Sequence, residues 1–338
     1  MALDFIKLTQ AAFEHNASDI HLGAGNEVYL RIDGRMRRVE GSSVEDQDIL
    51  SFLDQHMPPY VAAHLEQRRG ADFAWQPDPR MRFRVSAYYE RDRLRLVMRL
   101  IRIQIASLED LCLPEVITQM AHWERGIVLV TGVTGSGKST TLAALLQEIN
   151  RTSSRCIITI EDPIEMIHPN HKSLVSQREV GRDVESFRHG LVQALRQDPD
   201  VILIGEMRDP ETISTALRAA ETGHYVFSTM HTSNALHTLE RILSEFPEGE
   251  HALLREQLAN NLRATVTQRL VRRAGGGRCA ALEIMLVNSI IRKLLLENQI
   301  SSIGTVIRER KDGMMLFDQH LADMVRAQTV EEQEAYRY

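Results

Sequence analysis

The stretch that decides the fold is Gly126-Ile127-Val128-Leu129-Val130-Thr131-Gly132-Val133-Thr134-Gly135-Ser136-Gly137-Lys138-Ser139. An apolar run leads into Gly-x4-Gly-Lys-Ser and then into a segment of helical period, which is the order strand, phosphate-binding loop, helix. In such a loop the backbone N–H groups wrap the phosphates, Lys138 reaches the β- and γ-oxygens, and the Ser139 hydroxyl can ligate Mg²⁺. A glycine turn with chance spacing is the alternative, and the strand-loop-helix context argues against it. The sequence therefore predicts that ATP is bound by Gly132, Thr134, Gly135, Ser136, Gly137, Lys138, Ser139 and Thr140.

The residues that follow this loop predict an α/β core. Short apolar runs recur at 156–160, 201–204 and 225–230, and segments of helical period separate them. This is typical of a mostly parallel sheet that is buried on both faces. From Pro247 onward the pattern reads as largely helical, with one β-rich run at 279–286. We therefore expect an ATPase domain over residues 126–338 with a helical C-terminal part.

The residues that precede the loop predict a smaller α+β domain, residues 1–105, followed by a linker, residues 106–125. Asp33-Gly34 between two strand-like runs favours a type I′ hairpin turn. The expected elements are an amphipathic helix within 1–16, strands at 28–32 and 35–39, a helix at 46–56, and an antiparallel pair at 83–89 and 94–101.

Composition restricts the compartment and the partners. The 338 residues carry 40 Lys+Arg and 46 Asp+Glu, for a net charge of -6, and this acidity weighs against nucleic acid as a partner. Three scattered cysteines allow neither a disulfide framework nor a paired-cysteine metal site. We expect no signal peptide and no membrane span, because no apolar run approaches about 18 residues. A cytoplasmic ATP-binding protein is the class that remains.

Two acidic segments are candidates for the hydrolytic chemistry. Hydrolysis needs an oriented water, and P-loop enzymes place a carboxylate at the end of a neighbouring strand. Glu206 follows the run 201–204, directly after Gly205, which stands where many P-loop proteins carry Asp. The second segment is Glu161-Asp162-Pro163-Ile164-Glu165, and its alternative interpretation is a solvated acidic turn. The residues alone leave open which carboxylate activates water.

Two histidines, His224 and His231, stand at the two ends of the run 225–230. A single histidine is more often a satisfied structural residue than a catalytic one. Two that flank one strand favour a role in sensing the γ-phosphate. We predict that His231 is catalytic and that His224 contacts the nucleotide.

Taken together, these motifs resemble the secretion ATPases of the type IV pilus and type II secretion superfamily, and most of all their pilus retraction branch. The resemblance covers nearly the whole chain. It is carried by the phosphate-binding loop and by Ala17-Ser18-Asp19-Ile20-His21-Leu22, Ile160-Glu161-Asp162-Pro163-Ile164-Glu165, Leu195-Arg196-Gln197-Asp198-Pro199-Asp200, Gly205-Glu206-Met207-Arg208-Asp209 and Ala220-Glu221-Thr222-Gly223-His224.

The resemblance implies a PAS-like N-terminal domain, a RecA-like P-loop ATPase domain and a hexameric ring. It implies that Glu165 closes the family's Asp box and activates water, and that Glu206 is the Walker B glutamate, near Mg²⁺ directly or through water. His224 and His231 match the His box. It also implies that N-terminal arginines act on nucleotide. Arg84 and Arg99 match best and Arg102 less well, and ordinary solubilising arginines are the alternative.

The branch assignment implies a Mg²⁺-dependent ATPase at the inner face of the inner membrane, working with a platform protein and with other pilus motor ATPases. Retraction is favoured because the chain lacks the four-cysteine element of assembly ATPases. The branch motif Ala-Ile-Arg-Asn-Leu-Ile is replaced by Ile290-Ile291-Arg292-Lys293-Leu294-Leu295, so an accessory retraction or secretion ATPase remains an alternative. A nucleic-acid translocase and a slow nucleotide-bound regulator are the rivals from other classes. The direction of force does not follow from these motifs.

Overall fold

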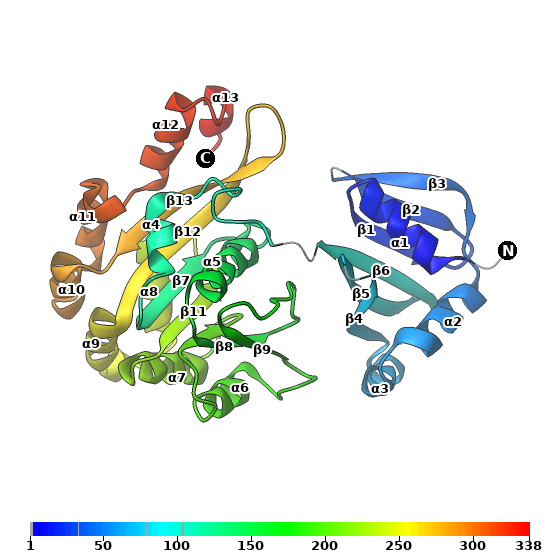
Figure 1. The fold of residues 1–338 in the computed structure, drawn as a ribbon, viewed down its shortest axis with the longest axis horizontal. Helices are drawn as coiled ribbons and strands as arrows, with labels where there is room; N and C mark the ends of the chain where they lie inside the picture. The colour runs from blue at the N-terminus through cyan, green and yellow to red at the C-terminus, as the bar shows by residue number, and fades with distance from the viewer. Residues whose placement is uncertain (1–2, 33, 79, 103–104) are drawn as a thin grey trace. The chain divides into compact units, whose positions relative to one another are not determined.

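The computed structural model describes residues 3–32, 34–78, 80–102 and 105–338 (Figure 1). The chain divides into two compact units, Met1–Gln104 and Ile105–Tyr338, and each is described by itself. No helix of the described residues is long and apolar enough to cross a membrane.

The first unit is an antiparallel sheet with three helices, α1 (Phe5–Glu14), α2 (Asp46–His56) and α3 (Pro59–Arg68). Its strand order is β3-β2-β1-β6-β5-β4, and all neighbouring pairs are antiparallel. The strands are β1 (Ala17–Gly23), β2 (Glu27–Ile32), β3 (Arg35–Ser43), β4 (Gly70–Asp78), β5 (Met81–Glu90) and β6 (Arg93–Arg102). One face of the sheet packs on the helices through Ile20, Phe83 and Met98, which belong to the same core cluster as Ile49 and Phe52 of α2.

The structure confirms the α+β class predicted for this part of the chain. The helix at Asp46–His56 and the two antiparallel pairs form where the sequence predicts them. The predicted Asp33-Gly34 turn falls partly outside the described residues, because Asp33 is not described. Helix α3 and strand β4 were not predicted.

Residues 106–125, predicted as a linker, are part of the second unit instead. They contain helix α4 (Glu115–Met120), and Leu108, Val116, Ile117 and Met120 are buried in the core of that unit. The apolar positions of this segment are therefore explained by packing.

The second unit is a seven-stranded sheet with the order β13-β12-β7-β11-β10-β8-β9, parallel except for β13. Helices α5 (Lys138–Thr152), α6 (Phe187–Ala194), α7 (Pro210–Glu221), α8 (Ala235–Ser244) and α9 (His251–Asn261) cover it. The strands are β7 (Gly126–Thr131), β8 (Cys156–Glu161), β9 (Leu174–Glu179), β10 (Val201–Ile204), β11 (Tyr225–Met230), β12 (Leu262–Arg272) and β13 (Arg278–Leu286).

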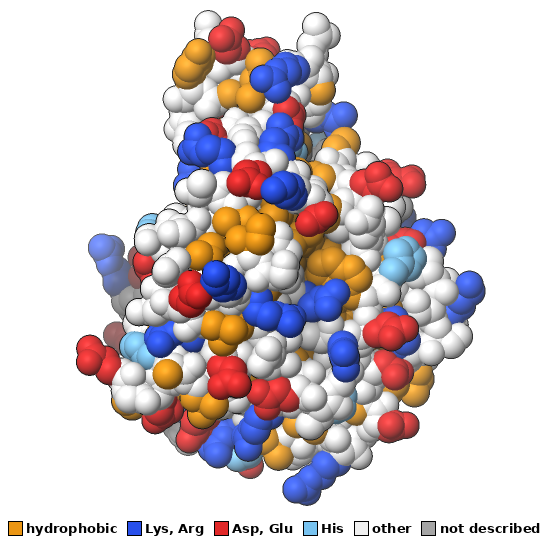
Figure 2. Space-filling model, turned by 90° about the vertical axis from the view of Figure 1, so that its left-hand side faces the viewer, with side chains coloured by type: hydrophobic (Ala, Val, Ile, Leu, Met, Phe, Trp, Pro, Cys, Tyr) orange, Lys and Arg blue, Asp and Glu red, His pale blue; other side chains and the backbone are white. Residues whose placement is uncertain are grey.

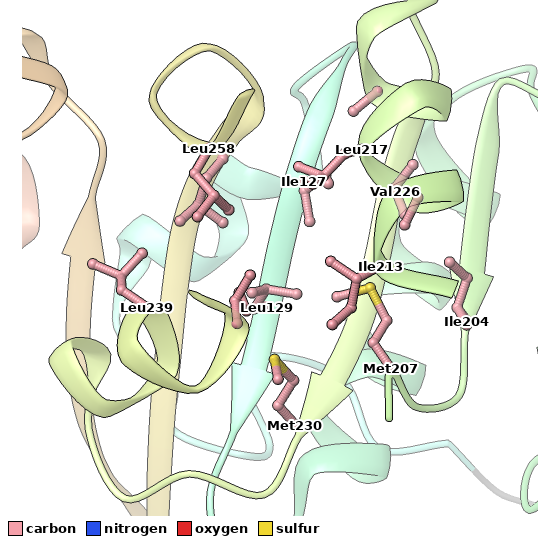
Figure 3. Packing of buried hydrophobic residues seen from close by; sticks show 14 of the residues in the cluster. Ile127, Leu129, Ile204, Met207, Ile213, Leu217, Val226, Met230, Leu239 and Leu258 are labelled. Atoms are coloured by element: carbon pink, nitrogen blue, oxygen red, sulfur yellow. The ribbon is translucent and has the colours of Figure 1, made fainter. Parts of the chain in front are cut away.

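Strand β7 shows why this sheet is buried on both faces. Ile127 and Leu129 point into one core cluster, with Ile213 and Leu217 of α7 (Figure 3). The alternate residues Val128 and Val130 belong to a second cluster with residues of α4 and α5. Period-2 alternation between two apolar layers produces the continuous apolar run that the sequence displays.

The four strands predicted from apolar runs are confirmed as β7, β8, β10 and β11. Strand β12 corrects the sequence analysis, which assigned this part of the chain to helix. It runs parallel to β7, and its residues Thr265, Thr267 and Gln268 are buried although they are polar. Those residues interrupt the hydrophobic pattern by which a strand is recognised.

The C-terminal part is helical, as predicted, with α10 (Ser289–Leu296), α11 (Ile303–Arg308), α12 (Phe317–Arg326) and α13 (Glu332–Ala335). In α10, Ile291 and Leu295 are buried, while Arg292 and Lys293 are exposed. On the face shown in Figure 2, basic, acidic and hydrophobic side chains are interspersed, and several basic side chains gather near its centre.

Candidate functional site

The phosphate-binding loop connects the end of β7 to the start of α5, as its motif requires. Gly132 has φ +139° and Gly137, the N-cap of α5, has φ +90°, both in the region that favours glycine. A Cβ atom at Gly132 would collide with the carbonyl oxygen of Gln268 and with Oγ of Ser136. Thr134, Gly135 and Ser139 are exposed at the rim of the loop, and Thr140 is half-buried in the first turn of α5. The loop therefore presents N–H groups and the helix N-terminus to an anion.

Lys138 lies inside this loop. Its Nζ donates to the carbonyl oxygens of Gly132 at 2.8 Å and Val133 at 3.2 Å. Burial lowers the pKa of Lys138, and the negative charges of Glu206 and Glu165 oppose that shift. The two predicted carboxylates follow different strands, β10 and β8, whose carboxyl ends lie at the same edge of the sheet as the loop because these strands run parallel to β11 and β7.

Glu206 is the centre of a charged cluster at the end of β10. Its Oε2 pairs with Nη2 of Arg208 at 2.6 Å, and its Oε1 lies 3.4 Å from Nε2 of His231. The Glu206 side chain is only 16% exposed. Arg208 was not among the predicted site residues, and its pairing with Glu206 raises the pKa of the guanidinium.

Gly205 has a steric reason to be glycine. A Cβ atom there would lie 3.2 Å from the ring of Phe187 and 3.3 Å from the carbonyl oxygen of Ile160. Its N–H donates to that same carbonyl at 2.8 Å. The aspartate found here in many P-loop proteins would crowd this close approach.

The acidic turn after β8 contains carboxylates of two kinds. Glu161 is half-buried and accepts from the Thr159 hydroxyl at 2.6 Å and from the Gln177 amide at 3.0 Å. Burial raises the pKa of Glu161 despite these bonds. Glu165 is exposed, at the outer end of the turn. The turn is therefore neither a fully solvated loop nor a uniform cluster, and Glu165 is its accessible carboxylate.

The structure separates the two histidines. Because β11 runs parallel to β7 in register, His231 follows β11 at the edge that carries the phosphate-binding loop. His224 precedes β11 at the opposite edge, about 20 Å away for six extended residues. There its Nδ1 contacts the carbonyl oxygen of Ala219 at 2.8 Å and the hydroxyl of Thr222 at 3.0 Å. This histidine closes the end of α7, away from the phosphate-binding loop of its own chain, and its contact with nucleotide stays a prediction.

Gln268 is a site residue that the sequence analysis missed. From β12 its Nε2 donates to the carbonyl oxygen of Ser136 in the phosphate-binding loop, at 2.6 Å. One residue earlier, Thr267 accepts a hydrogen bond from Thr131 at 2.8 Å. Within the described part of the chain, Gln268 Oε1 and Ser136 Oγ are buried atoms that have no hydrogen-bond partner.

A cavity of about 330 Å³ opens beside the loop. It is lined by residues of the 110–113 segment, by Gly137, Thr140 and Thr141, and by Gln268 and Leu270 of β12. Cys112 and Cys279 also line it. Its size is that of a small-molecule site, and its walls combine apolar and polar groups.

The sequence predicts two protein ligands for Mg²⁺, Ser139 and Glu206. The Ser139 hydroxyl is exposed at the start of α5. Glu206 is the predicted carboxylate ligand, and its side chain is 16% exposed. Among the residues that the structure describes, no group of three or more His, Cys, Asp or Glu could hold a metal. Mg²⁺ keeps several waters and substrate phosphates as ligands, so a hydroxyl and one carboxylate suit it.

Arg84 and Arg99 belong to the first unit, on neighbouring strands β5 and β6, directly opposite each other. Arg99 pairs with Asp19 at 2.9 Å, and Arg84 lies 3.8 Å from Asp72. Both arginines are at least partly exposed. The side chain of Arg102 lies outside the described residues.

Comparison with known proteins gives one family for nearly the whole chain. The family model for type II/IV secretion system proteins matches residues 3–293. The chain is 41% identical over 324 residues to the type IV pilus retraction ATPase PilT of Pseudomonas aeruginosa, which covers 96% of this chain and 94% of that protein. It is 37% identical to the type IV pilus ATPase PilU of the same organism, with 94% and 84% covered.

Among solved structures, the chain is similar to the pilus retraction motor PilT with bound ADP. The TM-score is 0.92 at 38% sequence identity, and the match covers 99% of this chain and 96% of that one.

Proposed function

The chain belongs to the type II/IV secretion system protein family, and from this we propose that it is an ATP-hydrolysing motor that drives retraction of a type IV pilus. The observation that carries the proposal is the convergence of Lys138, Glu206 and His231 at one sheet edge. The chain that carries this site is similar, along almost its full length, to a pilus retraction ATPase.

We infer that nucleotide phosphates bind the loop from Gly132 to Ser139 and that the base enters the neighbouring cavity. Lys138 would meet the β- and γ-oxygens, with Thr134, Gly135, Ser136 and Gly137 contributing the loop backbone. The unpartnered buried atoms of Ser136 and Gln268 support a polar ligand at this place. Thr140 lines the cavity and lies where the sugar would pass.

We propose that Glu165 activates the attacking water. One carboxylate oxygen of Glu206 pairs with Arg208, and the other lies 3.4 Å from Nε2 of His231. Glu165 is exposed on the turn that follows β8, at the sheet edge that carries the phosphate-binding loop, which supports a general base at that edge. Glu206 and His231 would then sense the γ-phosphate as a pair.

Ser139, with Glu206 directly or through water, would hold Mg²⁺. When bound, this ion neutralises charge on the phosphate oxygens. The residues of the chain supply the rest: Lys138 orients the phosphates, and the Glu206 carboxylate keeps Arg208 and His231 at the edge of the sheet.

We propose that the chain works as a homohexamer in which Arg84 and Arg99 of one copy act on nucleotide held by its neighbour. Such contacts need a head-to-tail interface, which closes into a ring. Mixing tests this: Arg84→Ala subunits combined with Lys138→Ala subunits should recover part of the ATPase activity that each lacks alone. No recovery at any ratio, with subunit exchange demonstrated, would count against arginines acting in trans.

The proposed place of action is the inner face of the inner membrane, on a platform protein of the pilus and beside other pilus motor ATPases. A deletion strain tests the function by its surface pili. Excess pili that do not retract are the expected result. Normal pilus numbers with weakened retraction would favour the accessory motor suggested by the altered segment 290–295, and cells without pili would overturn retraction in favour of assembly.

A further inference from the structure

One face of the first unit carries a row of charged side chains that the register of the sheet brings together. Asp19 on β1 lies opposite Arg31 on β2 and opposite Arg99 on β6, and Arg99 lies opposite Arg84 on β5. Directly opposite residues of an antiparallel pair project to the same face with Cβ atoms about 5 Å apart. The next residue along β1, Ile20, is buried on the other face. The four charged side chains thus span four adjacent strands.

Asp19 is the buried member of this row: its side chain is 7% exposed, and that of Arg99 is 67% exposed. Nε of Arg99 donates to Oδ1 at 2.9 Å, and the Ser18 hydroxyl donates to Oδ2 at 2.8 Å. Nε of Arg31 lies 3.8 Å from Oδ2. Burial by itself would raise the pKa of Asp19, but the bonds from Arg99 and Ser18 hold it below its usual value. Asp19 is therefore an ionised carboxylate that is fixed within the sheet.

Arg84 is held much less firmly than Arg99. Its Nη2 lies 3.8 Å from Oδ2 of Asp72 on β4, beyond hydrogen-bonding distance, and both side chains are about half exposed. An exposed ion pair at this separation restricts its members little. The row therefore contains one arginine that a buried group orients and one that keeps more rotamer freedom.

We propose that Asp19 is a positioning residue that pre-orients Arg99 for contact with the phosphates of a nucleotide bound to a neighbouring copy of this chain. The inference rests on the proposed function, in which Arg99 acts in trans. The bond to Asp19 uses the Nε–H of the guanidinium, one of its five N–H donors, and leaves the Nη donors to pair with phosphate oxygens. An arginine that is already ordered loses less rotamer freedom when it engages the nucleotide.

The test compares the full-length Asp19→Asn variant with wild type in steady-state ATPase assays. Asparagine keeps the shape of the side chain and removes the charge that holds the guanidinium. We expect kcat to fall about 3- to 10-fold, the cost of ordering one long side chain, while KM for ATP changes less than kcat. Asp72→Asn is the matched control on the same face, and we expect it to change kcat less than twofold.

A double-variant cycle separates positioning from a structural role. If Asp19 acts through Arg99, adding Asp19→Asn to Arg99→Ala should cause no further loss of kcat. A purely structural carboxylate would lower Tm and would reduce kcat by the same factor in both backgrounds. If Asp19→Asn does not fold, Asp19→Glu replaces it, because it keeps the charge and displaces the carboxylate by one methylene. The same loss of kcat is then expected, and again none in the Arg99→Ala background.

The outcomes distinguish the two levels of inference. A loss of kcat in Arg99→Ala together with wild-type kcat in Asp19→Asn overturns the positioning role and leaves the proposed function of Arg99 intact. Wild-type kcat in Arg99→Ala overturns both. Equal, multiplicative losses in the two backgrounds also overturn positioning and make the Asp19–Arg99 pair an ordinary stabilising contact of the sheet.

Discussion

The phosphate-binding edge of the second unit and the arginine-bearing face of the first unit are built in opposite ways. At the phosphate-binding edge, the backbone of one loop makes the site, and strands β7, β8, β10 and β11 end beside it. On the arginine-bearing face, side chains from the middles of strands meet only because the register places Asp19 opposite both Arg31 and Arg99.

This difference determines what a change of residue does. The phosphate-binding edge holds buried polar groups such as Lys138 and Gln268, whose partners are backbone atoms of the loop, so a substitution there disturbs the loop itself. Arg99 is largely exposed and Arg84 is about half exposed, and a substitution there changes the charge presented to a partner but leaves the sheet in place. The predictions below run from the largest expected effect to the smallest.

Lys138→Ala should reduce the turnover rate by at least about 10³-fold, because it removes a preorganised cation from the phosphate oxygens. It should also weaken nucleotide binding, measured by titration with a fluorescent ADP analogue. Lys311→Ala, at an exposed lysine that pairs with Glu309, is the control and should behave as wild type. If the Lys138→Ala enzyme hydrolysed ATP within a few-fold of wild type, the loop would not be the catalytic site.

Glu165→Gln and Glu206→Gln should distinguish the carboxylate that activates water from the carboxylate that senses the γ-phosphate. If Glu165 activates water, its amide variant should bind ATP and lose about 10²–10⁴-fold in turnover. Glu206→Gln should also impair turnover, since it releases Arg208 and His231. Near-normal turnover in Glu165→Gln would transfer the base role to Glu206, and Glu211→Gln, on the exposed start of α7, serves as control.

Gln268→Met should weaken ADP binding by about 3- to 10-fold, because it keeps the volume of the side chain and removes the hydrogen bond to Ser136. Isothermal titration of the purified protein measures this change. Thr265→Val is the matched control on the same strand: it removes a buried hydroxyl that has no partner among the described residues. Equal affinity in the Gln268 variant and the control would remove Gln268 from the site.

Charge reversal at Arg292 and Lys293 should have the smallest effect on hydrolysis. Both side chains are exposed on α10, and the pair of Lys293 with Glu297 spans 3.7 Å at the surface. Replacing both by Glu should change stability by no more than about 0.5 kcal/mol. ATPase rate and pilus retraction are measured side by side. If this helix couples the motor to its platform, we expect the variant to hydrolyse ATP at the wild-type rate and to lose pilus retraction. Normal retraction in the variant would show that the segment has no coupling role.

The sequence by itself determined the phosphate-binding loop, the two-part organisation and the strands β7, β8, β10 and β11. These features are encoded locally: glycines at fixed spacing allow one loop conformation, and apolar runs of four to six residues suit strands that are covered on both faces. The same local reasoning found the helix at Asp46–His56.

Only the tertiary structure decided which distant residues meet. Gln268 reaches Ser136 across 132 positions of sequence because β12 lies beside β7, and its polar neighbours hid that strand from pattern analysis. The six extended residues between His224 and His231 put them at opposite edges of the sheet. Asp19 holds Arg99 through cross-strand register alone. Register and strand order depend on the packing of the whole core, and no local stretch of sequence specifies them.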